Sequence, residues 1–169
     1  MSNPQQVHLT AAKNILRYLK GTLDYGIFYP SHDNCNLSVF TDADWAGEVD
    51  SRRSTSGILY KIGTTPIAWS SKLQPTLSLS STEAEYHVLS EAARNITYFH
   101  RLLNELQIGD KAPTLIFCDN LSSIRLVKNP VMHQQTKHIE LEHHYIWEKY
   151  EDGTIVISYV PQDPNKPTF

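Results

Sequence analysis

The longest periodic stretch of the chain, residues 81–107, constrains its fold most. Its apolar positions recur every three or four residues, which predicts one long amphipathic helix ending before Gly109. These positions are Ala84, Val88, Ala92, Ile96, Phe99, Leu103 and Leu106. Strand-like runs flank the helix at residues 37–42, 56–62, 66–70, 114–118 and 154–160. Three strands, a long helix, a strand, helices and a last strand indicate an α/β domain.

Three carboxylates lie where folding alone does not require them. Asp42 and Asp119 each end a strand-like run, and a parallel pairing of those strands would place them side by side. At about 100° per residue, Glu85 projects within the apolar arc of the long helix. Glu83 points to nearly the opposite side and pairs with Ser80 as a capping box. Three converging acids predict a site for hard divalent cations, which prefer oxygen ligands.

Each of these acids also has a structural explanation. Asp42 and Asp119 could be turn formers, since aspartate is common where a strand enters a loop. Glu85 could form a cap with Thr82, but a carboxylate directed toward the core is costly unless a cation meets it. We therefore interpret Asp42, Glu85 and Asp119 as catalytic residues that bind metal.

Composition narrows the class of protein. The chain has 169 residues, 40% of them apolar and 20% charged, as expected for one globular domain. No apolar run approaches the ~20 residues of a membrane span, so we expect no membrane partner. Two cysteines, Cys35 and Cys118, provide neither a disulfide framework nor a zinc-type spacing. We expect an intracellular protein, cytoplasmic or nuclear.

The formal net charge of −3 is unfavourable for binding nucleic acid, but it is unevenly distributed. Residues 51–82 carry four basic side chains and no acidic one. This stretch is either a solvated hairpin or a face that contacts phosphates through basic and hydroxyl groups. On the second interpretation the substrate-binding candidates are Arg52, Arg53, Ser54 and Asn120, and Asn120 could equally cap the helix that follows it.

The two ends of the chain differ in character. Residues 3–20 predict a helix with Asn3 as its cap, Pro4 at its first position and Gln6 completing a capping box. Its apolar face consists of Ala12, Ile15, Leu16 and Leu19. Residues 25–29 then predict a short strand. The seven residues 161–167 contain three prolines, Pro161, Pro164 and Pro167, which excludes a regular helix in the tail.

Five short motifs follow one another along the chain. They are TDADWAG (41–47), SRRSTSG (51–57), SSTEAEY (80–86), CDN (118–120) and KHIE (137–140). With them the chain resembles the ribonuclease H domain of copia-type LTR retrotransposon polyproteins, from about residue 7 to residue 161. Within that span, residues 7–30 resemble the segment that joins the reverse transcriptase to this domain.

The resemblance implies an α/β ribonuclease H-like fold, a five-stranded mixed sheet with flanking helices. An N-terminal connector helix would precede it, while the proline-rich tail of this chain predicts that a regular C-terminal helix is lacking. The corresponding division is a connector at residues 1–30, a ribonuclease H-like domain at 31–161 and an irregular tail at 162–169.

The resemblance also implies an activity. Asp42, Glu85 and Asp119 match the first three acids of the family, which hold two Mg²⁺ ions, with Mn²⁺ as a substitute. The implied enzyme is a Mg²⁺-dependent endoribonuclease that hydrolyses the RNA strand of an RNA–DNA hybrid.

The chain departs from the family at its C-terminus. The fourth acid of the family lies on a C-terminal helix, and Thr168 occupies its position here. Asp163 could substitute as a ligand or belong to an irregular tail. The alternative function is therefore a catalytically impaired module that acts in nucleic-acid binding or protein interaction. In that case the apolar face of residues 7–19 could fold back onto the domain or form a homodimer.

Other metal sites have less support in the sequence. Asp44 is interpreted as a solvated loop acid. A zinc protein based on His133, His138, His143 and His144 is a third hypothesis. Zinc sites on helices favour histidines four residues apart, whereas these are separated by five or six along the predicted helix.

Overall fold

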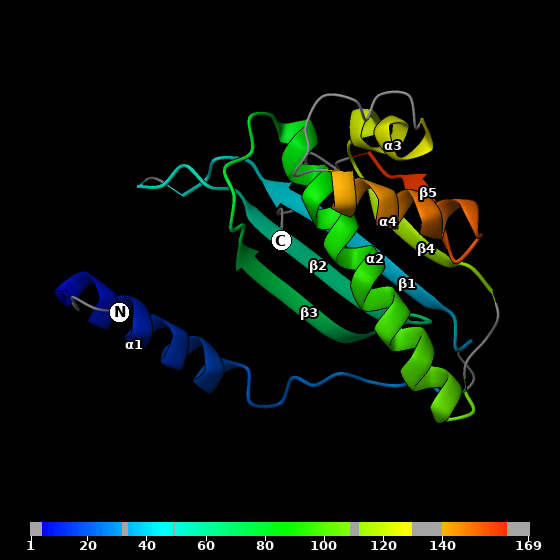
Figure 1. The fold of residues 1–169 in the computed structure, drawn as a ribbon. Coiled ribbons are helices and arrows are strands. Elements are labelled where there is room, and N and C mark those ends of the chain that lie inside the picture. The colour runs from blue at the N-terminus through cyan, green and yellow to red at the C-terminus, as the bar shows by residue number, and fades with distance from the viewer. Residues whose placement is uncertain (1–4, 32–33, 49, 109–111, 130–139, 162–169) are drawn as a thin grey trace.

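A computed structural model describes residues 5–31, 34–48, 50–108, 112–129 and 140–161 of the chain. Figure 1 shows the elements in the order α1 (Gln6–Gly21), β1 (Leu37–Asp44), β2 (Thr55–Ile62), β3 (Thr65–Leu73), α2 (Ser81–Glu105), β4 (Thr114–Cys118), α3 (Leu121–Lys128), α4 (Glu140–Glu151) and β5 (Ile155–Tyr159). The predicted order of strands and helices is confirmed for these residues.

The five strands form one mixed sheet in the order β3-β2-β1-β4-β5. β1, β2 and β3 make an antiparallel meander, whereas β4 pairs in parallel with both β1 and β5. In the β1–β4 register Phe40 lies opposite Phe117. Two residues further along, this register brings Asp42 next to Asp119. The parallel pairing predicted from the two acids is therefore confirmed.

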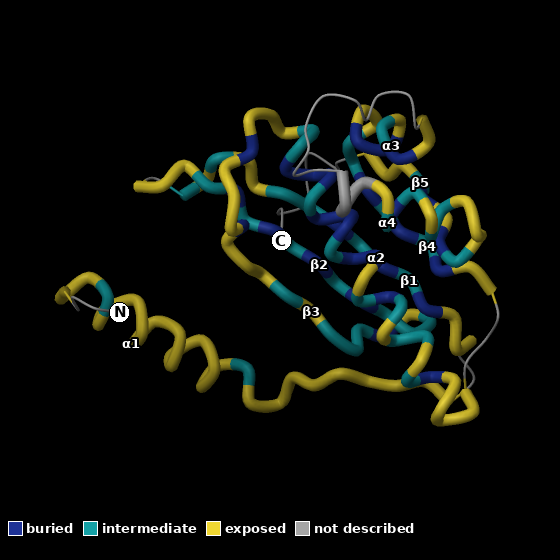
Figure 2. The backbone as a smooth tube through the Cα atoms, in the orientation of Figure 1, coloured by how far each residue is buried: buried dark blue, intermediate teal, exposed yellow. Residues whose placement is uncertain are grey.

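Helices α2, α3 and α4 cover one face of the sheet and pack against one another (Figure 1). Strand residues that face them alternate with residues that do not, and the former supply most of the buried core, including Val39, Ile58, Tyr60, Ile116 and Ile157. In Figure 2 the buried backbone is concentrated where α2 crosses β1 and β2. The core therefore fixes α2 against the strand that carries Asp42.

The start and end of α2 follow from local interactions. The Ser80 hydroxyl accepts a hydrogen bond from the Glu83 N–H at 3.1 Å, which confirms the predicted cap. The Glu83 carboxylate reaches back to the Leu79 N–H at 2.7 Å. The helix ends at Glu105, two residues earlier than expected, because Gln107 adopts a left-handed conformation with φ 60°.

The N-terminal region differs from its prediction in two ways. Helix α1 begins at Gln6, and the Nδ1 of His8 accepts the bond from the Gln5 N–H at 3.0 Å, a role that was predicted for Gln6. Residues 25–29 do not form a strand, and they meet the start of β3 through isolated bonds that include Phe28. No residue of α1 is buried. Asn3 and Pro4 lie outside the described residues.

Two tryptophans are also less buried than aromatic residues of a core would be. Large aromatic side chains favour the core, yet Trp45 is 49% exposed and Trp69 is 69% exposed. Trp45 lies in the loop after β1, and Trp69 lies on β3 opposite Leu59. The residues of the tail, 162–169, lie outside the described part of the chain.

Candidate active site

The three predicted acids come from three separate elements that meet at one edge of the sheet. Asp42 lies near the end of β1, Asp119 directly follows β4, and Glu85 is in the second turn of α2. Ligand atoms of Glu85, Asp119 and Cys118 all lie within 4.8 Å of one another. The structure thus brings together residues that are separated by more than thirty positions in the sequence, at the carboxyl ends of two parallel strands.

Glu85 is the most buried of these acids, at 4% exposure. Its Oε1 accepts a hydrogen bond from the Ala43 N–H at 3.0 Å. Burial raises the pKa of Glu85 to about 8, and the neighbouring charges of Asp119 and Asp42 act in the same direction. No ion pair of the described residues involves Glu85. A buried carboxylate surrounded by acids is costly in the absence of a cation.

The pKa of Asp42 is also raised, first by partial burial and then by the charge of Asp119, with a smaller contribution from Asp44. The Ala43 N–H acts in the opposite direction. Two carboxylates close enough for one to raise the pKa of the other destabilise one another unless a cation lies between them. Oxygen donors with this mutual repulsion fit a hard divalent ion such as Mg²⁺.

Cys118 also belongs to this cluster. Its side chain is buried, at 1% exposure. Its Sγ lies 3.9 Å from Oε2 of Glu85 and 3.5 Å from Oγ of Ser123. Burial is the main reason that the pKa of the thiol is raised. The only sequence signal for this contact is the position of Cys118 immediately before Asp119.

Three of the substrate-binding candidates lie on the loop between β1 and β2, at the same edge as the acids. Arg52 is exposed, with φ 56°, and the Nε of Arg53 donates to the Ser51 hydroxyl at 3.1 Å. Ser54 is fully buried, and its hydroxyl accepts a bond from the Ala46 N–H at 3.2 Å. Ser54 therefore holds the loop and does not present its hydroxyl to solvent, which corrects the prediction of a direct contact.

The fourth candidate, Asn120, is the N-cap of α3. Its Oδ1 accepts hydrogen bonds from the N–H groups of Ser122 and Ser123, both at 3.0 Å. The capping role predicted as an alternative is confirmed. The cap uses the amide oxygen of Asn120 and leaves its amide nitrogen without a role in the cap.

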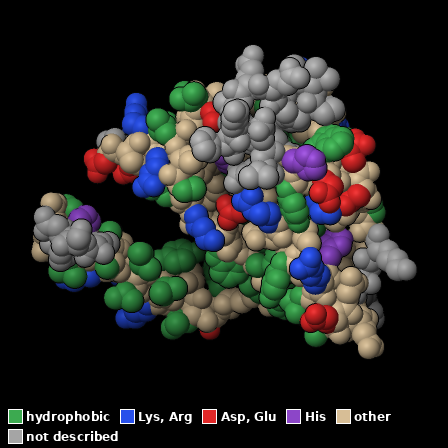
Figure 3. Space-filling view, in the orientation of Figure 1, with side chains coloured by type: hydrophobic (Ala, Val, Ile, Leu, Met, Phe, Trp, Pro, Cys, Tyr) green, Lys and Arg blue, Asp and Glu red, His purple; other side chains and the backbone are tan. Residues whose placement is uncertain are grey.

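The charges of the surface are arranged in small groups. In Figure 3 acidic and basic side chains both gather on the projecting loop between β1 and β2, and further basic side chains lie over the helical face. Lys72 of β3 lies 3.8 Å from Glu91 of α2, so part of the basic stretch is paired within the domain. A continuous basic surface is not visible on this face.

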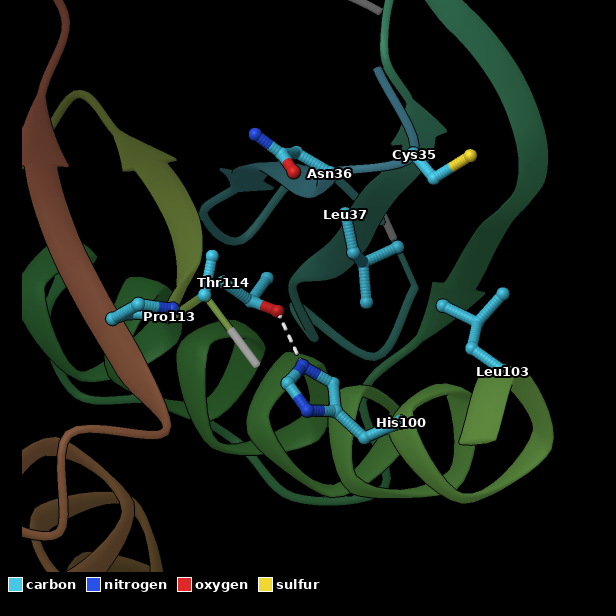
Figure 4. A pocket seen from close by; sticks show the side chains of 8 residues that line it. Cys35, Asn36, Leu37, His100, Leu103, Pro113 and Thr114 are labelled. Atoms are coloured by element: carbon cyan, nitrogen blue, oxygen red, sulfur yellow. Dashed lines mark hydrogen bonds between the residues drawn. The ribbon is translucent and has the colours of Figure 1, made fainter. Parts of the chain in front are cut away.

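A small cavity of about 20 Å³ lies at the other end of the sheet (Figure 4). Its lining includes Cys35, Leu37 and Leu103, with His100 and Thr114 beside them. The Nε2 of His100 and the Oγ1 of Thr114 are 2.6 Å apart, which ties α2 to β4. A volume of this size holds about one water molecule, so the cavity is not a ligand site.

The sequence and the fold of the chain can be compared with those of known proteins. No family model matches the chain. It is 40% identical over 160 residues to a retrovirus-related Pol polyprotein from transposon RE2 of Arabidopsis thaliana, which covers 95% of the chain and 11% of the polyprotein. It is 37% identical over 165 residues to the Pol polyprotein of transposon TNT 1-94 of Nicotiana tabacum, covering 98% of the chain and 12% of the polyprotein.

The chain is homologous to a segment of copia-type retrotransposon Pol polyproteins. It spans about a tenth of the length of these polyproteins, with 11% and 12% covered. Solved structures show which fold the chain resembles. LC11-RNase H1, isolated from compost, aligns with a TM-score of 0.55 and 17% identity, over 76% of this chain and 86% of that enzyme.

LC11-RNase H1 in complex with an RNA/DNA hybrid aligns with a TM-score of 0.54, at 13% identity, over 75% of this chain and 86% of that chain. At these identities the comparison establishes the fold alone. The copia-type chain therefore has the ribonuclease H-like fold that its motifs imply. Within the described residues no helix is both long and apolar enough to cross a membrane.

Proposed function

We propose that this chain is a Mg²⁺-dependent endoribonuclease that hydrolyses the RNA strand of RNA–DNA hybrids. The observation that carries the proposal is that Glu85 and Asp119 lie within one cluster of ligand atoms and that the charge of Asp42 acts on Glu85, as that of Asp119 acts on Asp42. Glu85 in particular is buried among acids and accepts a backbone N–H, an arrangement suited to binding a cation. The fold of the copia-type chain is consistent with this activity.

In this proposal Asp42, Glu85 and Asp119 hold two Mg²⁺ ions. Bound Mg²⁺ would supply charge that activates a water molecule and stabilises the leaving oxygen of the phosphodiester. The carboxylates position the ions and do not attack the substrate. The Ala43 N–H holds Oε1 of Glu85 through a hydrogen bond, and the Glu85 side chain is 4% exposed.

The proposed substrate is supported by two observations. LC11-RNase H1, whose fold this chain shares, has been solved with an RNA/DNA hybrid. Arg52 and Arg53 lie on the loop that follows β1, the strand that carries Asp42, where they could contact phosphates, and Asn120 directly follows Asp119 in the chain. The RNA strand would be recognised by its 2′-hydroxyls and groove shape and not by its sequence. We propose that the protein acts on this substrate in the cytoplasm or the nucleus.

The direct test compares a labelled RNA–DNA hybrid, single-stranded RNA and double-stranded RNA in Mg²⁺. We expect cleavage of the hybrid alone, and its loss in Asp42→Asn. Asp44→Asn is the matched control, because Asp44 is an exposed acid of the same strand and is not assigned to the site. Equal cleavage of all three substrates, or wild-type cleavage by Asp42→Asn, would contradict the proposal.

Metal binding can be measured without turnover. Calorimetry should detect Mg²⁺ binding to the wild-type chain and a weaker affinity in Asp119→Asn. The position of the family's fourth acid, Thr168, and the nearby Asp163 lie outside the described residues. If the fourth ligand is absent, Mn²⁺ should support more cleavage than Mg²⁺, because it tolerates mixed ligand sets and binds them more tightly. Brisk cleavage at low Mg²⁺ would show that a fourth acid is not limiting.

A second candidate function is supported by α1. Three apolar side chains of its exposed face, Ile15, Leu16 and Leu19, are each more than half exposed. An impaired ribonuclease H-like module that forms a homodimer through residues 1–30 would bury this face. Light scattering decides this point: a mass of one chain at high concentration would remove the homodimer, and a mass of two chains would support it.

A further inference from the structure

A polar side chain is buried beneath the first turn of α2, beside the acid cluster. Gln74, which follows β3, is 3% exposed. Its Nε2 donates to Oγ of Ser56 on β2 and to the carbonyl of Ala84 on α2, both at 3.0 Å. Its Oε1 accepts from Oγ of Ser78 at 2.9 Å. All the polar atoms of the amide therefore have partners, in three different segments.

The same network continues to the loop after β1. The Gln74 N–H donates to the Ser54 carbonyl at 2.8 Å, and the Ser54 hydroxyl accepts from the Ala46 N–H. The Nε1 of Trp45 donates to the Ser78 carbonyl at 3.1 Å. Gln74 thus lies at the centre of bonds that join the β1–β2 loop, β2 and α2.

The bond to Ala84 is the most informative of these contacts. Ala84 precedes Glu85 and is itself completely buried. A carbonyl in this part of a helix already accepts from the N–H four residues later, so the bond from Gln74 uses its second lone pair. The backbone hydrogen bonds of the helix are complete without this bond. The bond instead fixes the position of this turn along and around the helix axis relative to β2.

An apolar residue at position 74 would fill the same volume without the cost of burying an amide. A fully bonded glutamine at this site therefore points to a requirement for a defined position of α2 relative to β2, because hydrogen bonds constrain geometry more sharply than apolar contacts do. This positional requirement bears on two of the acids. Glu85 directly follows Ala84, and Asp42 precedes Ala43, whose N–H donates to Glu85.

We propose that Gln74 is a positioning residue that holds Glu85 at the correct distance from Asp42 and Asp119. The proposal rests on the proposed function, since it assigns Gln74 to the same metal site. It predicts that loss of the Gln74 amide weakens metal binding and turnover while the fold persists.

The test uses Gln74→Met, which keeps the length of the side chain and removes its polar atoms. Thr114→Val is the matched control, because it removes the bond to His100, which also ties α2 to the sheet. His100 lies fifteen residues beyond Glu85, about 22 Å along the helix. Each variant loses a hydrogen-bonded contact between α2 and the sheet side of the domain. Of the two contacts, only that of Gln74 lies next to the acids.

We expect the two variants to lose similar thermal stability and to differ in function. Gln74→Met should lower kcat on the hybrid and Mg²⁺ affinity by about 10-fold each, with KM within about twofold, as for residues that orient metal ligands. Thr114→Val should keep both quantities within about twofold of wild type. Equal kcat and equal Mg²⁺ affinity in the two variants would overturn the proposal.

Two further measurements keep the proposal testable. If Gln74→Met does not fold, Ser78→Ala removes a single bond to Oε1 and should shift Mg²⁺ affinity in the same direction by a smaller factor; an unchanged affinity would overturn the proposal. If the wild-type chain binds Mg²⁺ but cleaves no hybrid, the proposed function fails. The affinity difference between Gln74→Met and Thr114→Val then still decides the role of Gln74.

Discussion

Helices α1 and α2 are both amphipathic, yet they have opposite environments. α2 buries Val88, Leu89, Ala92 and Ile96 completely, and it carries Glu85 into the same interior. α1 buries none of its residues, and Leu16 is 65% exposed. Figure 2 shows the contrast along the two helices. An apolar stripe predicts that one face of a helix is buried, but the residues that pack against this face lie elsewhere in the chain.

The difference has a functional consequence. Because α2 is fixed by the sheet on one side and by α3 and α4 on another, its first turns can hold a carboxylate at a set position. α1 is connected to the domain through residues 22–36, where the Phe28 carbonyl accepts a bond from Thr65 at 2.9 Å. We therefore expect changes in α2 to alter catalysis and stability, and changes in α1 to alter neither.

The largest effect is expected for Glu85→Gln, which keeps the shape of the side chain and removes the charge that binds metal. Cleavage of the hybrid should fall by at least about 100-fold. The matched change in α1, Lys13→Gln, also removes one charge and should leave the initial rate within about twofold. A Glu85→Gln enzyme that cleaves at the wild-type rate would show that this acid is not a ligand.

The next effect concerns packing. Leu89→Ala in α2 removes a fully buried side chain and should lower the free energy of unfolding by about 2–5 kcal/mol. Leu16→Ala in α1 makes the same chemical change on an exposed face and should cost no more than about 0.5 kcal/mol in a dilute, monomeric sample. Urea denaturation of both variants measures the difference. Similar losses would mean that α1 is packed against the domain in solution.

A smaller effect is expected from pH in the metal-free protein. The pKa of Glu85 is raised from 4.5 to about 8, so folding favours its protonated form. Its contribution to stability is complete below about pH 4.5 and is lost as the pH rises through about 8. Thermal unfolding should show this loss in the wild type and not in Glu85→Gln. Added Mg²⁺ should reverse it, because bound metal favours the ionised carboxylate.

The smallest effect on the domain itself is expected for Leu16→Asp. This change places a charge on the apolar face of α1 and should keep hybrid cleavage within about twofold. If the chain forms a homodimer through α1, light scattering should show its mass fall to that of one chain. A dimer that persists in Leu16→Asp would assign the interface to another surface.

Much of the fold could be predicted from local patterns. The strands and α2 follow from alternation and from three-to-four spacing, and the cap at Ser80 follows from its pairing with Glu83. Errors occurred where the outcome depends on distant partners. Residues 25–29 have the composition of a strand, but no strand of the described chain pairs with them. Trp69 looks like a core residue, yet it is mostly exposed.

The site was predictable in part for the same reason. Helical geometry separates Glu85 from Glu83, since the two directions differ by about 200°. The ends of two parallel strands predict that Asp42 and Asp119 meet. Neither rule could find Gln74, because its partners Ser56, Ser78 and Ala84 become neighbours only after β2, β3 and α2 have packed. Nor could either rule show that Ser54 is buried.

The sequence by itself determined the order of the five sheet strands and of α2 and the likeness to copia-type polyproteins, and it predicted that the three acids meet, because these depend on residue type and on spacing within one element. Tertiary structure alone decided which apolar faces are covered, how deeply Glu85 is buried and which side chains fix its position. The physical reason is that burial and electrostatic energy depend on distances between segments. Those distances are set by the register of the sheet and the packing of α2 across it.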